Sequence, residues 1–159
     1  INTNSCIRLA NQAKAVGVKK FIFASTHMIY ETSHYLPIDE NHPINPKGNY
    51  AITKLINENI CKMYSSSYSL NIIILRIASV YGEGQSKNFL IPTLMKNCIK
   101  NNTMIIHKYK NGYQLMDLIH VNDVCKAINL ACKSKIKFDI FNIISVDSLL
   151  LIFFLLKLK

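Results

Sequence analysis

The segment Leu70–Arg76 constrains the fold more than any other part of the chain. It reads Leu-Asn-Ile-Ile-Ile-Leu-Arg, and its apolar residues do not alternate as in a strand that has one face in water. A strand of this kind is typical of a parallel sheet that is covered on both faces. Further strands are expected at 20–25 and 138–143, with a short one at Met104–His107.

The first helix is expected at 3–16, where the apolar residues share one side. The residues expected to face inward are Ile7, Leu9, Ala10 and Ala13. Gly17 follows at the place of a C-terminal cap, because glycine adopts the left-handed backbone of that position easily.

Further helices alternate with the strands. They are expected at 49–66, 89–99 and 122–133. Asn122 is expected to cap the last of these, and 31–48, with its prolines, is expected to be a loop. Because strands alternate with helices, we predict an α/β fold with a doubly wound parallel sheet.

Tyr50 and Lys54 lie one helical turn apart, so a phenol and an ammonium share one face of the helix. The lysine cation favours ionisation of the tyrosine, which can then exchange a proton with a substrate oxygen near neutral pH. The strand at 20–25 runs into the hydroxyl of Thr26. Chemistry gathers at the carboxyl ends of strands in an open α/β sheet, so we expect Thr26 and Tyr50 to meet.

At these residues the chain resembles the extended short-chain dehydrogenase/reductase superfamily, and in particular its NAD-dependent epimerase/dehydratase family, which acts on nucleotide sugars. Several separate motifs occur in the family's order. They are Gly17–Thr26, Met28–Tyr30, Pro46–Lys54 with Glu58, Leu75–Gly82 and Asp117–Val124. The resemblance implies a Rossmann-type sheet.

The resemblance also implies a role for each matching side chain. Tyr50 would be the general acid/base, and Lys54 would stabilise the tyrosinate and hydrogen-bond the nicotinamide ribose. Thr26 would share the substrate oxygen. Ala78 would line the cofactor, and Ser79 would contact the substrate. The implied cofactor is NAD or NADP, and no metal is expected.

The family's glycine-rich phosphate loop has no counterpart here, because the 5 glycines form no such fingerprint. The chain is therefore interpreted as N-terminally incomplete, the C-terminal half of the dinucleotide-binding domain plus part of the substrate-binding region. Residues 1–82 are assigned to the first part and 83–159 to the second, which is interleaved with the last strand. The choice between NAD and NADP would be made in the missing half.

Departures from the family pattern bear on the reaction. Sugar 4,6-dehydratases of this family carry an Asp-Glu pair directly after the threonine, whereas His27 and Met28 stand here, which disfavours dehydration. Met116 replaces an arginine that commonly grips the diphosphate. Ser79 replaces an asparagine that often contacts the sugar nucleotide.

These observations leave three hypotheses. The first is an NAD-dependent nucleotide-sugar epimerase, favoured by Thr26, Tyr50 and Lys54 together. The second is a reductase of the same superfamily that acts on another carbonyl substrate, favoured by Met116 and Ser79. The third is a truncated, non-catalytic remnant or a protein-binding relic, favoured by the missing glycine-rich loop.

Plainer structural interpretations stand beside the catalytic ones. Thr26 can be a strand-end hydroxyl that satisfies backbone groups, and Tyr30 can be a packing residue. Glu58 can pair with a cation instead of acting in catalysis. His120 and Asp123 are interpreted as structural rather than as a catalytic pair.

The formal net charge of +10 raises the question of a polyanionic partner. The 19 lysines and arginines are scattered, with Lys19-Lys20 as the only doublet, so a nucleic-acid partner is not expected. We expect a small anionic substrate, a nucleotide sugar, and we consider a homodimer. The five cysteines lie in predicted helices without metal-ligand spacing, which indicates free thiols in a reducing compartment and a cytoplasmic protein.

Leu149–Leu156 is a continuous apolar run, which is shorter than the roughly 20 residues of a spanning helix, so no membrane role is expected. We expect a helix there, capped within Ser145–Ser148 and apolar around its circumference. Such a helix must be buried, or it would cause the chain to associate.

Overall fold

The computed structural model describes residues 2–30, 34–102, 108–109, 112–113, 115–145 and 149–150. The chain forms two compact units. The first comprises Ile1–Ala78 and Cys125–Ile143, and the second comprises Ser79–Val124 and Ile144–Lys159. No helix among the described residues is both long enough and apolar enough to cross a membrane.

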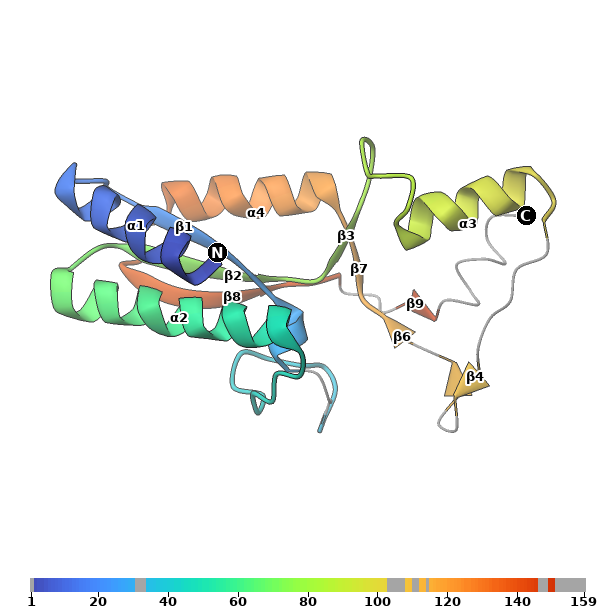
Figure 1. Ribbon diagram of the computed structural model, residues 1–159, viewed down its shortest axis with the longest axis horizontal. Coiled ribbons are helices and arrows are strands. Elements are labelled where there is room, and N and C mark those ends of the chain that lie inside the picture. Colours follow the sequence, from blue (N-terminus) through green and yellow to red (C-terminus); the bar gives the residue numbers. More distant parts are fainter. Residues whose placement is uncertain are drawn as a thin grey trace. The chain divides into compact units, whose positions relative to one another are not determined.

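A three-stranded parallel sheet forms the centre of the first unit (Figure 1). Its strands, in spatial order, are β1 (Phe21–Thr26), β2 (Ile72–Ile77) and β8 (Phe138–Ile143). The central strand, β2, is buried along almost its whole length, as the apolar run Ile72–Leu75 predicts. The prediction of an α/β fold with a parallel sheet is confirmed.

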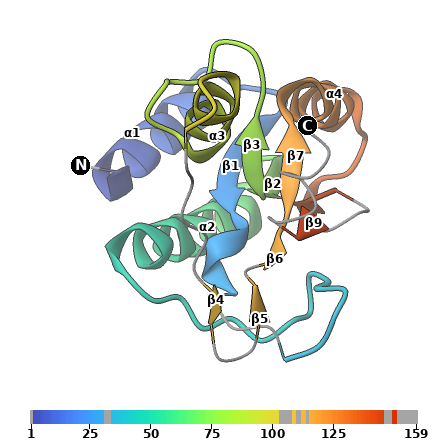
Figure 2. The same cartoon turned by 90° about the vertical axis from the view of Figure 1, so that its right-hand side faces the viewer.

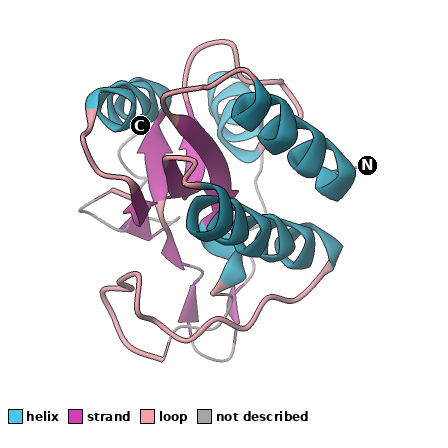
Figure 3. Cartoon of the chain, turned by 90° about the vertical axis from the view of Figure 1, so that its left-hand side faces the viewer, coloured by secondary structure: helices cyan, strands magenta, loops and turns pink. Residues whose placement is uncertain are grey.

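Helices cover both faces of this sheet, as Figure 3 shows with the strands in magenta. α1 (Asn2–Ala15) and α2 (Asn49–Tyr68) pack against one face. α4 (Val121–Lys133) packs against the other face through Ala131, which is buried with Ile73 and Leu75 of β2. A short 3₁₀ helix, η1 (His27–Ile29), follows β1 directly.

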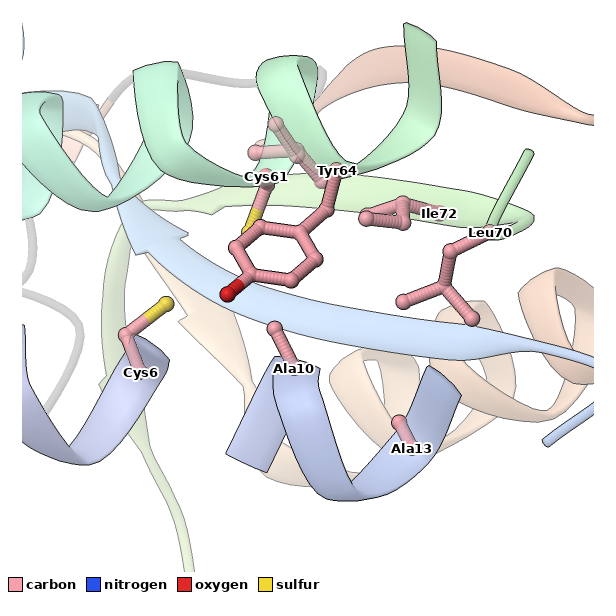
Figure 4. Packing of buried hydrophobic residues seen from close by; sticks show 8 residues of the cluster. Cys6, Ala10, Ala13, Cys61, Tyr64, Leu70 and Ile72 are labelled. Atoms are coloured by element: carbon pink, nitrogen blue, oxygen red, sulfur yellow. The ribbon is translucent and has the colours of Figure 1, made fainter. Parts of the chain in front are cut away.

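Small residues allow α1 to lie close to α2. Ala10 and Ala13 were predicted to face inward and are buried, together with Cys6. Figure 4 shows the thiols of Cys6 and Cys61, from the two helices, turned toward each other. The prediction for Leu9 is wrong, because its side chain is 61% exposed. Leu9 lies on the flank of the helix, beside the line of small side chains that makes the contact.

The end of α1 has the geometry that its sequence predicts. Gly17 has a φ of 68°, and its N–H donates to the carbonyl of Lys14 at 3.2 Å. The N–H of Val18 donates to the carbonyl of Ala13 at 2.9 Å. These two bonds form a Schellman motif, which satisfies carbonyl groups that the helix itself leaves free.

The second unit contains a parallel pair of strands, β3 (Ser79–Tyr81) and β7 (Leu118–His120), which run side by side in Figure 2. α3 (Leu90–Ile99) packs against them through Ile91 and Leu94, which are buried with Leu118. Two short antiparallel pairs complete the described part. They join β4 (Lys108–Tyr109) to β5 (Gly112–Tyr113) and β6 (Leu115–Met116) to β9 (Leu149–Leu150).

The strand β9 corrects the helix predicted over Leu149–Leu156, because Leu149 and Leu150 pair with β6 instead. Ser145, expected to cap that helix, donates its backbone N–H to the carboxylate of Asp117 at 3.0 Å. The rest of the predicted helix lies outside the described residues. So do the strand predicted at 104–107 and the first residues of the loop, 31–33.

The prediction that Asn122 caps α4 is also wrong, because the helix begins one residue earlier. The helix begins at Val121, so Asn122 already lies in its first turn. The N–H of Asn122 donates to Nδ1 of His120 at 3.2 Å, and the histidine ring therefore satisfies a free N–H at the start of the helix. This contact supports the structural interpretation of His120.

Candidate active site

The three strands of the first unit end at the same level. Thr26, the last residue of β1, lies opposite Ile77 of β2, which in turn lies opposite Ile143 of β8. Ala78 follows β2 and is buried, and its N–H donates to the carbonyl of Ile143 at 3.0 Å. This carboxyl edge is where ligands bind in open α/β sheets.

Lys54 joins α2 to this edge. Its Nζ donates to the backbone carbonyl of Ala24, two residues before Thr26, at 2.7 Å. The same Nζ lies 5.7 Å from the centre of the Tyr50 ring and 5.1 Å from that of Phe23. Partial burial lowers the pKa of Lys54 from its ordinary value, and the nearby Cys6 thiol opposes that shift. The ammonium is thus held between the helix and the strand end.

Tyr50 lies in the first turn of α2, which begins after Gly48, a residue with a φ of 80°. The Tyr50 side chain is 49% exposed, so a dissolved molecule can reach the phenol. A side chain that exchanges protons with a substrate needs this access. The structure therefore brings Tyr50 and Lys54 together, as their spacing predicts.

Thr26 is buried at the end of β1, and its hydroxyl accepts a hydrogen bond from the N–H of Met28 at 3.3 Å. That contact caps η1 and is the one expected if Thr26 satisfies backbone groups. Its hydroxyl proton can still be donated to another oxygen. α2 contacts both β1 and η1, so Thr26 lies in the part of the unit that holds Lys54.

The residues that depart from the family pattern have ordinary structural surroundings. The ring of His27 donates to the carbonyl of Ile77 at 3.2 Å, and Met28 is 47% exposed. In the second unit, Ser79 begins β3, and its N–H donates to the carbonyl of Asp117 at 3.2 Å. Met116 packs against the apolar cluster of that unit.

A cavity of about 430 Å³ lies in the second unit, between the turn after β3 and the start of α4. Phe89, Tyr81 and Gln85 are among its lining residues. The side-chain oxygen of Gln85 is buried and has no hydrogen-bond partner within the described residues. Gly82 also lines the cavity, and a Cβ there would lie 2.4 Å from a methyl group of Val121. The cavity can therefore hold a small molecule with a group that donates to Gln85.

Glu58 has a buried partner, Arg76, that is not among the predicted site residues. Glu58 and Arg76 are both buried, and their closest charged atoms, Oε2 and Nη2, lie 2.8 Å apart. The expectation that Glu58 pairs with a cation is confirmed. A signal was present in the sequence, because Arg76 is the one charged residue in the apolar strand β2 and a buried charge requires a partner.

A model of the NAD dependent epimerase/dehydratase family matches residues 1–143 of the chain. A putative UDP-glucose 4-epimerase of Methanocaldococcus jannaschii is 34% identical over 139 residues, which are 85% of this chain and 45% of that protein. A human dTDP-D-glucose 4,6-dehydratase is 30% identical over 135 residues, 85% of this chain and 38% of that protein. The chain thus spans less than half the length of these relatives.

Solved structures show the same similarity. UDP-N-acetylglucosamine 4-epimerase from Methanobrevibacter ruminantium superimposes with a TM-score of 0.89 at 25% identity, over 97% of this chain and 50% of that one. UDP-glucose 4-epimerase from Thermotoga maritima, solved with UDP-glucose, gives a TM-score of 0.86 at 26% identity, with the same shares covered.

Proposed function

Because this chain belongs to the NAD dependent epimerase/dehydratase family, we propose that it supplies the proton-transferring residues of a nucleotide-sugar epimerase. The observation that carries the proposal is the placement of Lys54. Its ammonium bridges from α2 to the carbonyl of Ala24 at the carboxyl edge of the sheet and lies beside the Tyr50 ring. A cation and an accessible phenol at that edge are suited to proton transfer with a sugar hydroxyl.

Each of the three side chains has a separate task in this proposal. Tyr50 takes the proton from a sugar hydroxyl as that carbon is oxidised and returns it when the carbon is reduced. Lys54 stabilises the ionised phenol and offers its remaining N–H donors to the nicotinamide ribose. Thr26 donates its hydroxyl proton to the same substrate oxygen and orients it.

The residues present fit the nicotinamide side of NAD or NADP. Lys54 uses one N–H on Ala24 and has further donors for ribose hydroxyls, and the buried Ala78 offers a compact surface at the same edge. NAD, when bound, supplies the hydride chemistry of such enzymes. The chain's own residues supply the proton and hold the sugar.

We further propose that the substrate is a nucleotide sugar and that the reaction is epimerisation, not dehydration. The exposed thioether of Met28 cannot donate or accept a proton, so it cannot serve as the second acid or base that loss of water requires. A contact between Ser79 and the substrate is part of this proposal. The assignment of 1–82 to cofactor binding and 83–159 to substrate binding is part of this proposal.

One observation favours a second candidate, a reductase of the same superfamily that acts on another carbonyl compound. Met116 packs against Ile91 and Leu94 in an apolar cluster, which leaves no cation at that position for a diphosphate. The third candidate is a non-catalytic remnant.

A homodimer formed through α2 is also proposed. Ile52, Ile56 and Met63 are each more than two-fifths exposed and lie on the side of α2 that faces away from the sheet. The positions i, i+4 and i+11 form one stripe along a helix. A second copy of α2 could cover this apolar stripe. The free thiols fit the cytoplasmic location that we propose.

The test is Tyr50→Phe in the complete gene product that contains this chain, assayed with a panel of UDP- and dTDP-sugars. We expect turnover to fall by about 10²- to 10⁴-fold, because a positioned acid/base contributes that much, while NAD affinity changes little. Tyr68→Phe, on the same helix, is the matched control and should retain full turnover.

Comparable turnover in Tyr50→Phe and the parent protein would remove the acid/base role. A parent protein that turns over no nucleotide sugar but oxidises or reduces another carbonyl or alcohol would favour the reductase. A protein that binds neither NAD nor NADP would favour the remnant.

A further inference from the structure

A row of polar side chains crosses the sheet one residue before its carboxyl edge. Ser25 of β1 lies opposite Arg76 of β2, and Arg76 lies opposite Asn142 of β8. The earlier rows on the same face are apolar. They are Phe21 with Ile72 and Phe138, and Phe23 with Ile74 and Ile140, all of which pack against α1 and α2. The polar row is the last one beneath α2 before the carboxyl edge.

Glu58 reaches down from α2 onto this row. The hydroxyl of Ser25 donates to its Oε1. Arg76 donates from Nη2 to its Oε2 at 2.8 Å and from Nε to its Oε1 at 3.2 Å. Ser25, Glu58 and Arg76 are each at least 95% buried. One carboxylate thus ties α2 to both β1 and β2.

The row also holds the loop that precedes α2. Arg76 donates from Nη1 to the hydroxyl of Tyr30 at 2.6 Å, and Tyr30 donates to the side chain of Asn142 at 2.8 Å. The backbone N–H of Asn142 donates to the carboxylate of Glu40 at 2.6 Å, and its side chain donates to the carbonyl of Ile38 at 3.3 Å. The loop segment 38–40 is therefore fixed to the same network.

Stability alone does not account for this arrangement. Removing two charges from water costs several kcal/mol for each ion, and apolar residues of the same volume often stabilise such a site equally well or better. The two apolar rows that precede it show that this face of the sheet accepts apolar side chains. The ion pair adds a fixed orientation, because a bidentate contact orients both partners relative to each other.

This fixed orientation affects the candidate active site, because Glu58 lies one helical turn after Lys54 and Ser25 lies directly before Thr26. The Glu58 carboxylate therefore fixes the rotation of α2 next to the lysine and the end of β1 next to the threonine. Among the hydrogen bonds of the described part of the chain, Lys54 itself makes one with β1, to the carbonyl of Ala24.

We propose that Glu58 and Arg76 are positioning residues of the candidate active site, which hold the helix of Tyr50 and Lys54 in register with the strand end that carries Thr26. The inference rests on the proposed function. It makes a separate statement about the location of Lys54, which can be tested without turnover.

The main variant replaces the pair by apolar residues, Glu58→Leu with Arg76→Met, so that no unpaired charge remains. In the complete gene product we expect kcat to fall about 10- to 100-fold, because small displacements of positioned groups have effects of that size, with a smaller change in KM. Lys62→Met, which removes a charge from the exposed side of the same helix, should leave both constants unchanged.

A second measurement follows Lys54 in this chain directly. The chain is acetylated briefly at a series of pH values, and peptide mass spectrometry measures the extent of acetylation at Lys54. The pH at which this extent is half-maximal is the Lys54 midpoint. If the pair holds Lys54 in its partly buried place, the midpoint should move upward in the double variant, because the ammonium returns to water. A purely structural role would leave the midpoint where it is in the parent chain.

A folded double variant with unchanged kcat and an unchanged Lys54 midpoint would overturn the inference. If the parent protein has no turnover, the proposed function fails. The Lys54 midpoint then still shows whether Glu58 and Arg76 position Lys54. If the double variant does not fold, Ser25→Ala replaces it, since it removes only the hydroxyl that ties Glu58 to β1. A smaller shift in the same direction supports the inference, and no shift overturns it.

Discussion

Arg76→Met, made alone, should destabilise the first unit strongly. It leaves the carboxylate of Glu58, which is 3% exposed, with the Ser25 hydroxyl but without a cation. It also removes the donor to the Tyr30 hydroxyl. Breaking one side of a buried ion pair costs about 3–5 kcal/mol, because the remaining charge stays uncompensated. Domains of this size have net stabilities of about 5–15 kcal/mol, so the variant would be close to unfolding.

The assay is urea unfolding of this chain, followed by circular dichroism, for the parent, the single variant and the double variant Glu58→Leu with Arg76→Met. The double variant should recover most of the lost free energy of unfolding, because no buried charge is left unpaired. In thermal scans the single variant should melt about 10 °C lower than the parent, given roughly 2–4 °C for each kcal/mol.

A loss below about 1 kcal/mol in Arg76→Met would refute this reasoning, since that is the value of a solvent-exposed pair. A double variant no more stable than the single one would also contradict it. In that case the loss would come from the shape of the missing side chain and not from its charge.

Three further predictions concern other parts of the first unit. Lys54→Met should weaken NAD affinity as well as turnover, measured by cofactor titration, and unchanged affinity would contradict its proposed contact with the ribose. Ile56→Lys should convert a dimer to a monomer in sedimentation, whereas Ile128→Lys, on α4, should not; a monomeric parent would refute the dimer. Burial raises the pKa of Tyr30 above its ordinary value of 10, so the unfolded state loses this proton first. The free energy of unfolding should therefore fall as pH rises above 10, and urea titrations should show a shallower fall in Tyr30→Phe.

The features that follow from local sequence were predictable. The apolar run in β2 indicated a strand buried on both faces, and Gly17 marked the end of α1. Tyr50 and Lys54 share a helix face because of the helical repeat alone. These features depend on residues within one or two turns of one another, where backbone geometry leaves few choices.

The predictions are wrong where contacts between segments distant in the sequence determine the structure. Leu9 was expected inside because leucine is apolar, but the approach of α1 to α2 is set by the smaller Cys6, Ala10 and Ala13, which leave Leu9 on the flank. Leu149 and Leu150 form a strand because β6 offers them backbone partners, and no periodicity in their own segment indicates this.

The polar network around Arg76 is predictable from the sequence in part. A charge within a buried strand needs a partner, so Arg76 alone predicts that one of the 9 acidic residues lies against it. To identify Glu58 as that acidic residue, one must know the register of β2 against β1 and the rotation of α2 about its axis. A shift of one residue in β2 would turn Arg76 away from Glu58 and toward the opposite face, where Ala131 of α4 packs with Ile73 and Leu75. The ion pair therefore forms only in the observed register, and it stabilises that register. For this reason, mutation of either partner should change the environment of Lys54.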